Sequence, residues 1–180
     1  MISNALAPVG SLPLAWSLEP GFGLEFLEVE ALDSLGTVVP VALEADWTMN
    51  SHGVRGRFSV RNPDALARPL EEIRLKFLLK TSPTVDQIFV QSVAMTGNVG
   101  LRSADGELRS AGFMGWTDRG GTMAAVAGFL DHADAATHLV VSPADGEGSW
   151  EFSAVVSREN LDLEPGGTLT LPPFAVMTGP

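Results

Sequence analysis

The stretch AAVAGFL at residues 124–130, with the apolar segments that follow it, decides the fold. Residues 137–141 (THLVV) and 150–156 (WEFSAVV) are rich in β-branched and aromatic side chains, and LEPGGTL at 163–169 places a turn before another apolar segment. Short apolar runs separated by Pro, Gly and Asp are typical of strands joined by turns. This part of the chain therefore predicts the closing strands of a β-sandwich.

Alternating apolar and polar residues extend that prediction toward the N-terminus. Every second side chain is apolar in residues 72–80, and residues 55–61 show the same period of two, which indicates strands with one face in a core. Residues 23–32 also alternate, but their phase slips by one residue, as it does at a β-bulge. We expect an all-β fold, an antiparallel β-sandwich of the supersandwich type, with about ten to twelve short strands. Residues 1–180 would form one domain.

Two local features predict the connections. Asp105-Gly106 is a sequence typical of a two-residue hairpin turn. Residues 131–137 contain three alanines and are the best short helical or turn segment. The polar residues of that segment, Asp131, His132 and Asp134, are interpreted as a solvated turn with capping aspartates, and no metal site is predicted.

Charge and composition narrow the class of partner. The chain has 180 residues, 22 acidic against 11 basic side chains, a formal net charge of −11 and no cysteine. A negative chain repels phosphate groups, so neither nucleic acid nor an anionic membrane surface is an expected partner. Disulfides and thiolate metal sites are excluded, and no cofactor is expected. Residues 1–10 lack the charged and apolar regions of a signal peptide, so we expect a cytoplasmic protein.

Several segments, taken in order, resemble a known family of domains. They are RFSVRN at 57–62, PLEEIRL at 69–75, DQIFVQS at 86–92, VAGFL at 126–130 and LEPGG at 163–167. Over residues 35–178 the chain resembles the N-terminal β-sandwich domain of melibiase-type α-galactosidases and related glycoside hydrolases. The family usually has an aromatic-rich segment of the type GYQSW near its barrel interface, where this chain has FVQSV at 89–93 and lacks the Trp.

The resemblance implies a fold and a role. The fold would be a galactose-mutarotase-like supersandwich, and the chain would be the non-catalytic part of a glycoside hydrolase. A following (β/α)8 barrel would carry both catalytic carboxylates, so no catalytic residue is assigned in this chain. Its partner would be a carbohydrate or its own catalytic barrel, and a homo-oligomer is the further possibility. Phe113, Met114, Trp116 and residues 174–177 are the expected docking surface.

Aromatic and polar side chains supply the candidate carbohydrate site. An exposed Trp can stack on the apolar face of a sugar ring, and Trp116, in the Gly-rich sequence GWTDRGG at 115–121, is the leading candidate for such a ring. Trp47 is the second. Asp118, Arg119 and Gln91 could bind sugar hydroxyls. For each of the five, a structural role in the core, a turn or the strand surface is the competing interpretation, whereas Trp150 alternates with Phe152 and is predicted to be core.

Three further functions stay open beside the non-catalytic domain. A free-standing carbohydrate-binding module would depend on Trp116 and Trp47, and a structural sandwich protein would bind no sugar. A small mutarotase-like enzyme would use a carboxylate base with a His acid, for which His52 and His138 are present. A fold of this kind does not decide among them.

Overall fold

The computed structural model describes residues 14–19, 21–81, 85–91, 100–103, 106–121, 124–131 and 135–179. Within those ranges the chain forms strands and turns and no helix. The strands, in chain order, are β1 (Leu14–Leu18), β2 (Phe22–Leu32), β3 (Ala42–Asn50), β4 (Gly53–Arg61), β5 (Arg68–Lys80), β6 (Val85–Val90), β7 (Gly100–Ser103), β8 (Leu108–Ala111), β9 (Phe113–Asp118), β10 (Ala124–Phe129), β11 (Ala136–Pro143), β12 (Ser149–Leu163), β13 (Thr168–Thr170) and β14 (Phe174–Gly179).

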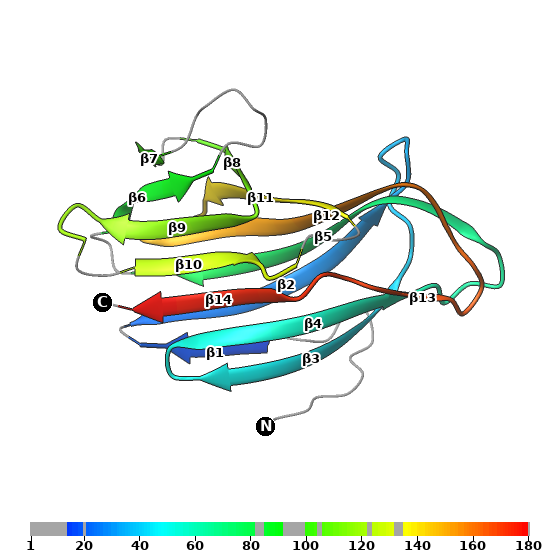
Figure 1. Cartoon of the computed structure of the whole chain (residues 1–180), viewed down its shortest axis with the longest axis horizontal. Coiled ribbons are helices and arrows are strands. Elements are labelled where there is room, and N and C mark those ends of the chain that lie inside the picture. The colour runs from blue at the N-terminus through cyan, green and yellow to red at the C-terminus, as the bar shows by residue number, and fades with distance from the viewer. Residues whose placement is uncertain are drawn as a thin grey trace.

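These strands build two antiparallel sheets. The six-stranded sheet has the order β1-β2-β5-β12-β11-β8, and the eight-stranded sheet has the order β13-β4-β14-β10-β9-β6-β7, with β3 paired to β4. Figure 1 shows the strands of both layers running in nearly the same direction, as in an aligned sandwich. The predicted all-β sandwich is confirmed, although the described strands outnumber the prediction and β5 and β12 are long, with 13 and 15 residues.

The core lies between the sheets and is centred on Phe77 of β5, which is fully buried. Its ring stacks on Phe152 of the same sheet and on Phe174 of the opposite sheet, with ring centroids 5.0 and 5.3 Å apart. Phe58 from β4 meets it edge-on at 6.4 Å. Buried aromatic side chains remove a large apolar area from water, so this cluster contributes strongly to holding the two layers together.

The alternation patterns place the strands correctly. Residues 73, 75, 77 and 79 are buried, and the predicted phase slip in residues 23–32 is a break in the pairing of β2 with β5 between Phe26 and Glu28. Leu27 is the extra residue, and its side chain is 41% exposed. Trp150 is buried, as predicted, and its indole nitrogen donates to Thr81 Oγ1 at 3.2 Å.

The predicted hairpin around Asp105-Gly106 is wrong. Asp105 lies outside the described residues, but β7 before it pairs with β6 in the eight-stranded sheet and β8 after it pairs with β11 in the six-stranded sheet. The connection therefore passes from one sheet to the other. The predicted helical or turn segment at 131–137 is also corrected, because Ala136 and Thr137 begin β11, while residues 132–134 lie outside the described ranges.

Among the described residues, no helix is long and apolar enough to cross a membrane. In the same residues, no group of three or more His, Asp or Glu side chains is arranged to hold a metal ion.

Candidate functional site

A polar hollow of about 330 Å³ lies on the outer face of the six-stranded sheet. Its volume is at the lower end of the range for small-molecule sites. Alternate residues of β5, β12 and β11 point to the same side of the sheet, and β8 closes the edge. The lining side chains are Glu72, Arg74, Lys76, Glu107, Arg109, His138, Val140, Ser142, Glu151, Ser153 and Val155.

Strand register brings these residues into rows across the sheet. Arg74, Val155 and His138 lie side by side in one row. Ser153 and Val140 follow in the next row, between Lys76 and Arg109. In a third row, Glu151 lies opposite Ser142. Same-face neighbours on paired strands are about 5 Å apart, so side chains from four strands can reach one small ligand.

Each basic group of the polar hollow is held by carboxylates. Lys76 Nζ donates to Glu28 Oε1 at 2.8 Å and lies 3.5 Å from Glu30 Oε2. The hydrogen bond to Glu28 raises the pKa of Lys76, with burial acting against it. Arg74 Nε is 2.6 Å from Glu72 Oε1.

Arg109 is likewise paired, because its Nε lies 3.1 Å from Glu107 Oε1. The bases of the hollow are therefore fixed and largely neutralised by their neighbours, which leaves them little free charge to attract an anion.

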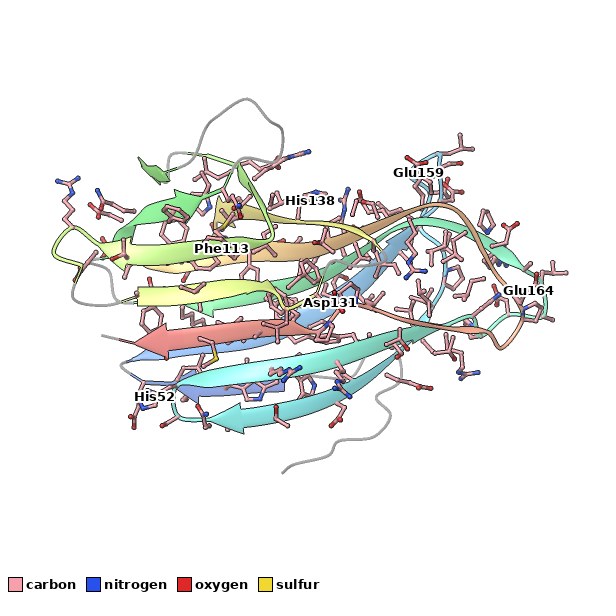
Figure 2. All side chains as sticks on the ribbon, viewed as in Figure 1. His52, Phe113, Asp131, His138, Glu159 and Glu164 are labelled. Carbon is pink, nitrogen blue, oxygen red and sulfur yellow. The ribbon has the colours of Figure 1, made fainter. Side chains whose placement is uncertain are left out.

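The other polar groups of the hollow are free to bind a ligand. His138 is half-buried on β11 near the middle of the molecule, whereas the turn at Glu164 lies at one end (Figure 2). Burial lowers the pKa of His138, and this favours the neutral imidazole. No protein hydrogen bond from its ring, from Ser142 or from Ser153 occurs among the described residues, and Glu151 has no ion-pair partner there. A neutral imidazole, two hydroxyls and a carboxylate can donate and accept several hydrogen bonds.

The predicted aromatic platforms are buried, which corrects the expectation of exposed rings. Trp116 is fully buried and packs on Phe152 with ring centroids 5.4 Å apart. It belongs to strand β9 rather than to a loop, and alternation points it inward with Met114. Trp47 is 5% exposed and lies between Trp16 and Phe58. Neither ring can stack on a sugar in this conformation.

The other three predicted site residues, Asp118, Arg119 and Gln91, are not gathered around an exposed Trp ring. Arg119 is exposed, and its Nε pairs with Asp86 Oδ2 at 2.8 Å, while Asp118 ends β9 nearby. Gln91 follows the other end of β6, where its backbone nitrogen donates to Ser110 Oγ at 2.7 Å. Carbohydrate binding by these residues stays a prediction.

An apolar strip occupies the outer face of the eight-stranded sheet. We define the apolar strip as Phe89, Phe113, Val126 and Met177, of which the last three are 40–49% exposed. The Phe89 and Phe113 rings stack at 5.7 Å, and Val126 lies opposite Met177. Gly115 separates Phe89 from Val126 and keeps the strip flat. Phe113, labelled in Figure 2, was predicted as docking surface and is exposed. Of residues 174–177, which were predicted with it, only Met177 is exposed, because Phe174, Ala175 and Val176 are buried. Met114 and Trp116, also predicted there, are core.

Comparison with known proteins shows the fold. No protein-family profile and no curated protein matches the chain. A GH36 α-galactosidase from Geobacillus stearothermophilus, solved in complex with stachyose, has a similar structure, with a TM-score of 0.51 and 10% sequence identity. The match covers 99% of this chain and 27% of that one. The α-galactosidase from Lactobacillus brevis is 10% identical with a TM-score of 0.48, over 97% of this chain and 25% of that one.

A galactose mutarotase-like protein from Clostridium acetobutylicum is 9% identical with a TM-score of 0.45, over 98% of this chain and 65% of that one. The chain therefore spans about a quarter of the α-galactosidases and less than two thirds of the mutarotase-like protein. At these identities the likeness to the Geobacillus enzyme shows a shared sandwich fold.

Proposed function

We propose that the chain is a non-catalytic sandwich domain of an α-galactosidase-like glycoside hydrolase, and that it packs on a (β/α)8 catalytic domain. The fold shared with the Geobacillus α-galactosidase supports this proposal, as does the family resemblance of residues 35–178. The observation that carries it is the apolar strip, because contiguous exposed apolar surface on a soluble protein marks an interaction site.

The apolar strip has the features of a docking surface. Its side chains come from the adjacent strands β6, β9, β10 and β14, so they form one continuous area. The small residues Gly115, Gly128 and Ala175 lie between them and leave no polar side chain in the middle. Beyond β14 the face turns polar, with Arg55 and Arg57 exposed on β4. An apolar centre with a polar border is the usual anatomy of a protein interface.

Sedimentation velocity of the 180-residue chain tests the docking surface. With no catalytic domain present, the strip should drive reversible self-association that increases with protein concentration. Replacing Val126 and Met177 together by Ser should shift the chain to monomer. Leu35→Ser is the matched control, because Leu35 is 88% exposed in a turn outside the strip. A wild-type chain that stays monomeric at every concentration would contradict a docking role.

A carbohydrate-binding module is the second candidate, and the polar hollow favours it. The free groups of His138, Ser142, Ser153 and Glu151 suit a polyhydroxylated ligand, although the floor is made by Val140 and Val155 rather than by an aromatic ring. Titration with galactose and glucose, followed by NMR, should shift signals on β11 and β12. Shifts that persist in Ser142→Ala/Ser153→Ala would contradict binding in the hollow.

A further inference from the structure

We infer that the polar hollow binds a saccharide that carries a protonated amine, such as a glucosamine unit. The inference rests on the carbohydrate-binding candidate above and adds the chemical class of the sugar. It depends on the charged side chains in and around the hollow, namely on how many carboxylates and how many basic groups there are, and on which of them form ion pairs.

Carboxylates outnumber basic groups around the hollow. Arg74, Lys76 and Arg109 are its three cations, and each is paired with at least one carboxylate. The carboxylates are five, namely Glu28, Glu30, Glu72, Glu107 and Glu151. The lining itself is balanced, with three carboxylates and three cations, and the negative excess comes from Glu28 and Glu30, which contact Lys76 from outside the lining, in a chain whose net charge is −11. The local field attracts a cation and repels an anion such as a uronate or a sugar phosphate.

Glu151 is the carboxylate that a ligand cation can use. Glu28, Glu30, Glu72 and Glu107 each hold a basic side chain, whereas Glu151 has no ion-pair partner among the described residues. It lies on β12, where its backbone pairs with Leu78 on one side and Ser142 on the other. Neither of these two neighbours supplies a positive charge. The cations that flank Leu78 on the same face of β5 are Lys76, which Glu28 and Glu30 hold, and Lys80. An ammonium group beside Glu151 would form a charge-assisted hydrogen bond, which is stronger than a neutral one.

Hydroxyl-binding groups surround Glu151 at the spacing of one sugar ring. Ser142 is its direct neighbour across the sheet, and Ser153 lies two residues further along the same strand. Two residues along a strand span about 7 Å, and cross-strand neighbours are about 5 Å apart. His138 lies four residues from Ser142 along β11, about 13 Å away, so it faces a neighbouring unit of the saccharide and not the ring beside Glu151. An amine and its neighbouring hydroxyls on one ring can therefore be bound together.

Calorimetric titration with two matched ligands tests the inference. Chitotriose carries free amines, and its fully N-acetylated form has the same rings without the charge. We expect chitotriose to bind about tenfold more tightly near pH 6, and its affinity to fall as salt is added. Glu151→Gln should bind both ligands equally. Glu164→Gln is the control, because it removes the same charge at the distant turn after β12 and should keep the difference (Figure 2).

The outcomes separate the two proposals. Equal affinity of wild-type protein for both ligands would overturn the amine inference while leaving the carbohydrate-binding candidate in place. Failure of both ligands and of neutral hexoses to bind would overturn both. Preference for chitotriose that survives in Glu151→Gln would overturn the assigned role of Glu151. Circular dichroism of each variant checks that the sheet is intact, which is expected because Glu151 is exposed.

Discussion

Gly56 shows how tightly single residues constrain the core. A Cβ atom at this position would lie 2.6 Å from Cζ3 of Trp47 and 2.7 Å from Cε2 of Phe58, and both rings are buried. Gly56→Ala should therefore destabilise the protein by about 1–3 kcal/mol through overpacking. At Gly23 the nearest side-chain atom is an ordinary 3.6 Å away, so Gly23→Ala should cost less than about 0.5 kcal/mol. Urea denaturation of both variants checks the difference, and equal stability would contradict it.

His138 should make stability depend on pH. Burial is the main cause that lowers its pKa in the folded protein, Arg109 and Arg74 act in the same direction, and Glu72 opposes them. The unfolded chain therefore takes up this proton at a higher pH, near about 6.5, than the folded chain does. Below that pH the unfolded state binds more protons, so stability falls as the pH drops toward the lowered folded-state pKa.

The variant His138→Gln isolates this effect, because glutamine does not titrate. Its free energy of unfolding should fall less between about pH 7 and about pH 5 than that of the wild type. His52→Gln, at an exposed position between β3 and β4, serves as the control for the loss of a histidine outside the hollow. An unchanged pH dependence in His138→Gln would contradict the assignment.

At the scale of elements, the bulge in β2 should tolerate the deletion of one residue and not that of another. Phe26 pairs with Phe77, and Glu28 pairs with the next residue of β5, Lys76, so Leu27 is the extra residue. Deleting Leu27 leaves a regular ladder in which each later side chain keeps its face. Deleting Val29 instead would turn Glu30 toward the core, and an unpaired buried carboxylate costs several kcal/mol.

Circular dichroism and thermal unfolding check this pair of deletions. The protein without Leu27 should keep its β-sheet spectrum and unfold cooperatively, whereas the protein without Val29 should be largely unfolded. Loss of the fold in both deletions would show that the bulge itself is required.

Local patterns predict elements, but they do not predict which strands become neighbours. The alternation in residues 72–80 and the phase slip at Leu27 were readable because burial repeats every two residues along one strand. The hairpin predicted at Asp105-Gly106 was wrong because pairing partners are chosen by the whole sandwich, and the chain changes sheet there. The prediction for Trp116 was wrong for a related reason. The nearby glycines indicated a loop, but Trp116 lies on strand β9 and points into the core.

The polar hollow was not predicted from the sequence, because its residues come together only through the pairing of separate strands. Glu151 and Ser153 alternate with the buried Trp150 and Phe152, so they lie on the outer face of their strand. Their place beside Lys76 and Arg74 depends on the pairing of β12 with β5, two strands that are far apart in the sequence. The signal in the sequence that could have indicated a polar site is the number of predicted strands whose outward-facing residues combine Ser or His with charged side chains.

At the scale of the whole molecule, the two sheets present opposite chemistry. The outer face of the six-stranded sheet carries paired charges around the polar hollow, and the outer face of the eight-stranded sheet carries the apolar strip. The hollow suits a small polar ligand, while the strip suits a protein surface. Under the proposals above, the domain would pack through the apolar strip and keep the polar hollow open to solvent on the opposite face.

The most direct test of the proposed function is to read the gene beyond the codon for Pro180. The proposal predicts that the frame continues for roughly 250 codons or more and encodes alternating strand and helix patterns of a (β/α)8 barrel. It also predicts two acidic residues at the carboxyl ends of barrel strands, where the pair of catalytic carboxylates would lie. A stop codon directly after Pro180, or a continuing frame without such a barrel, would contradict the account.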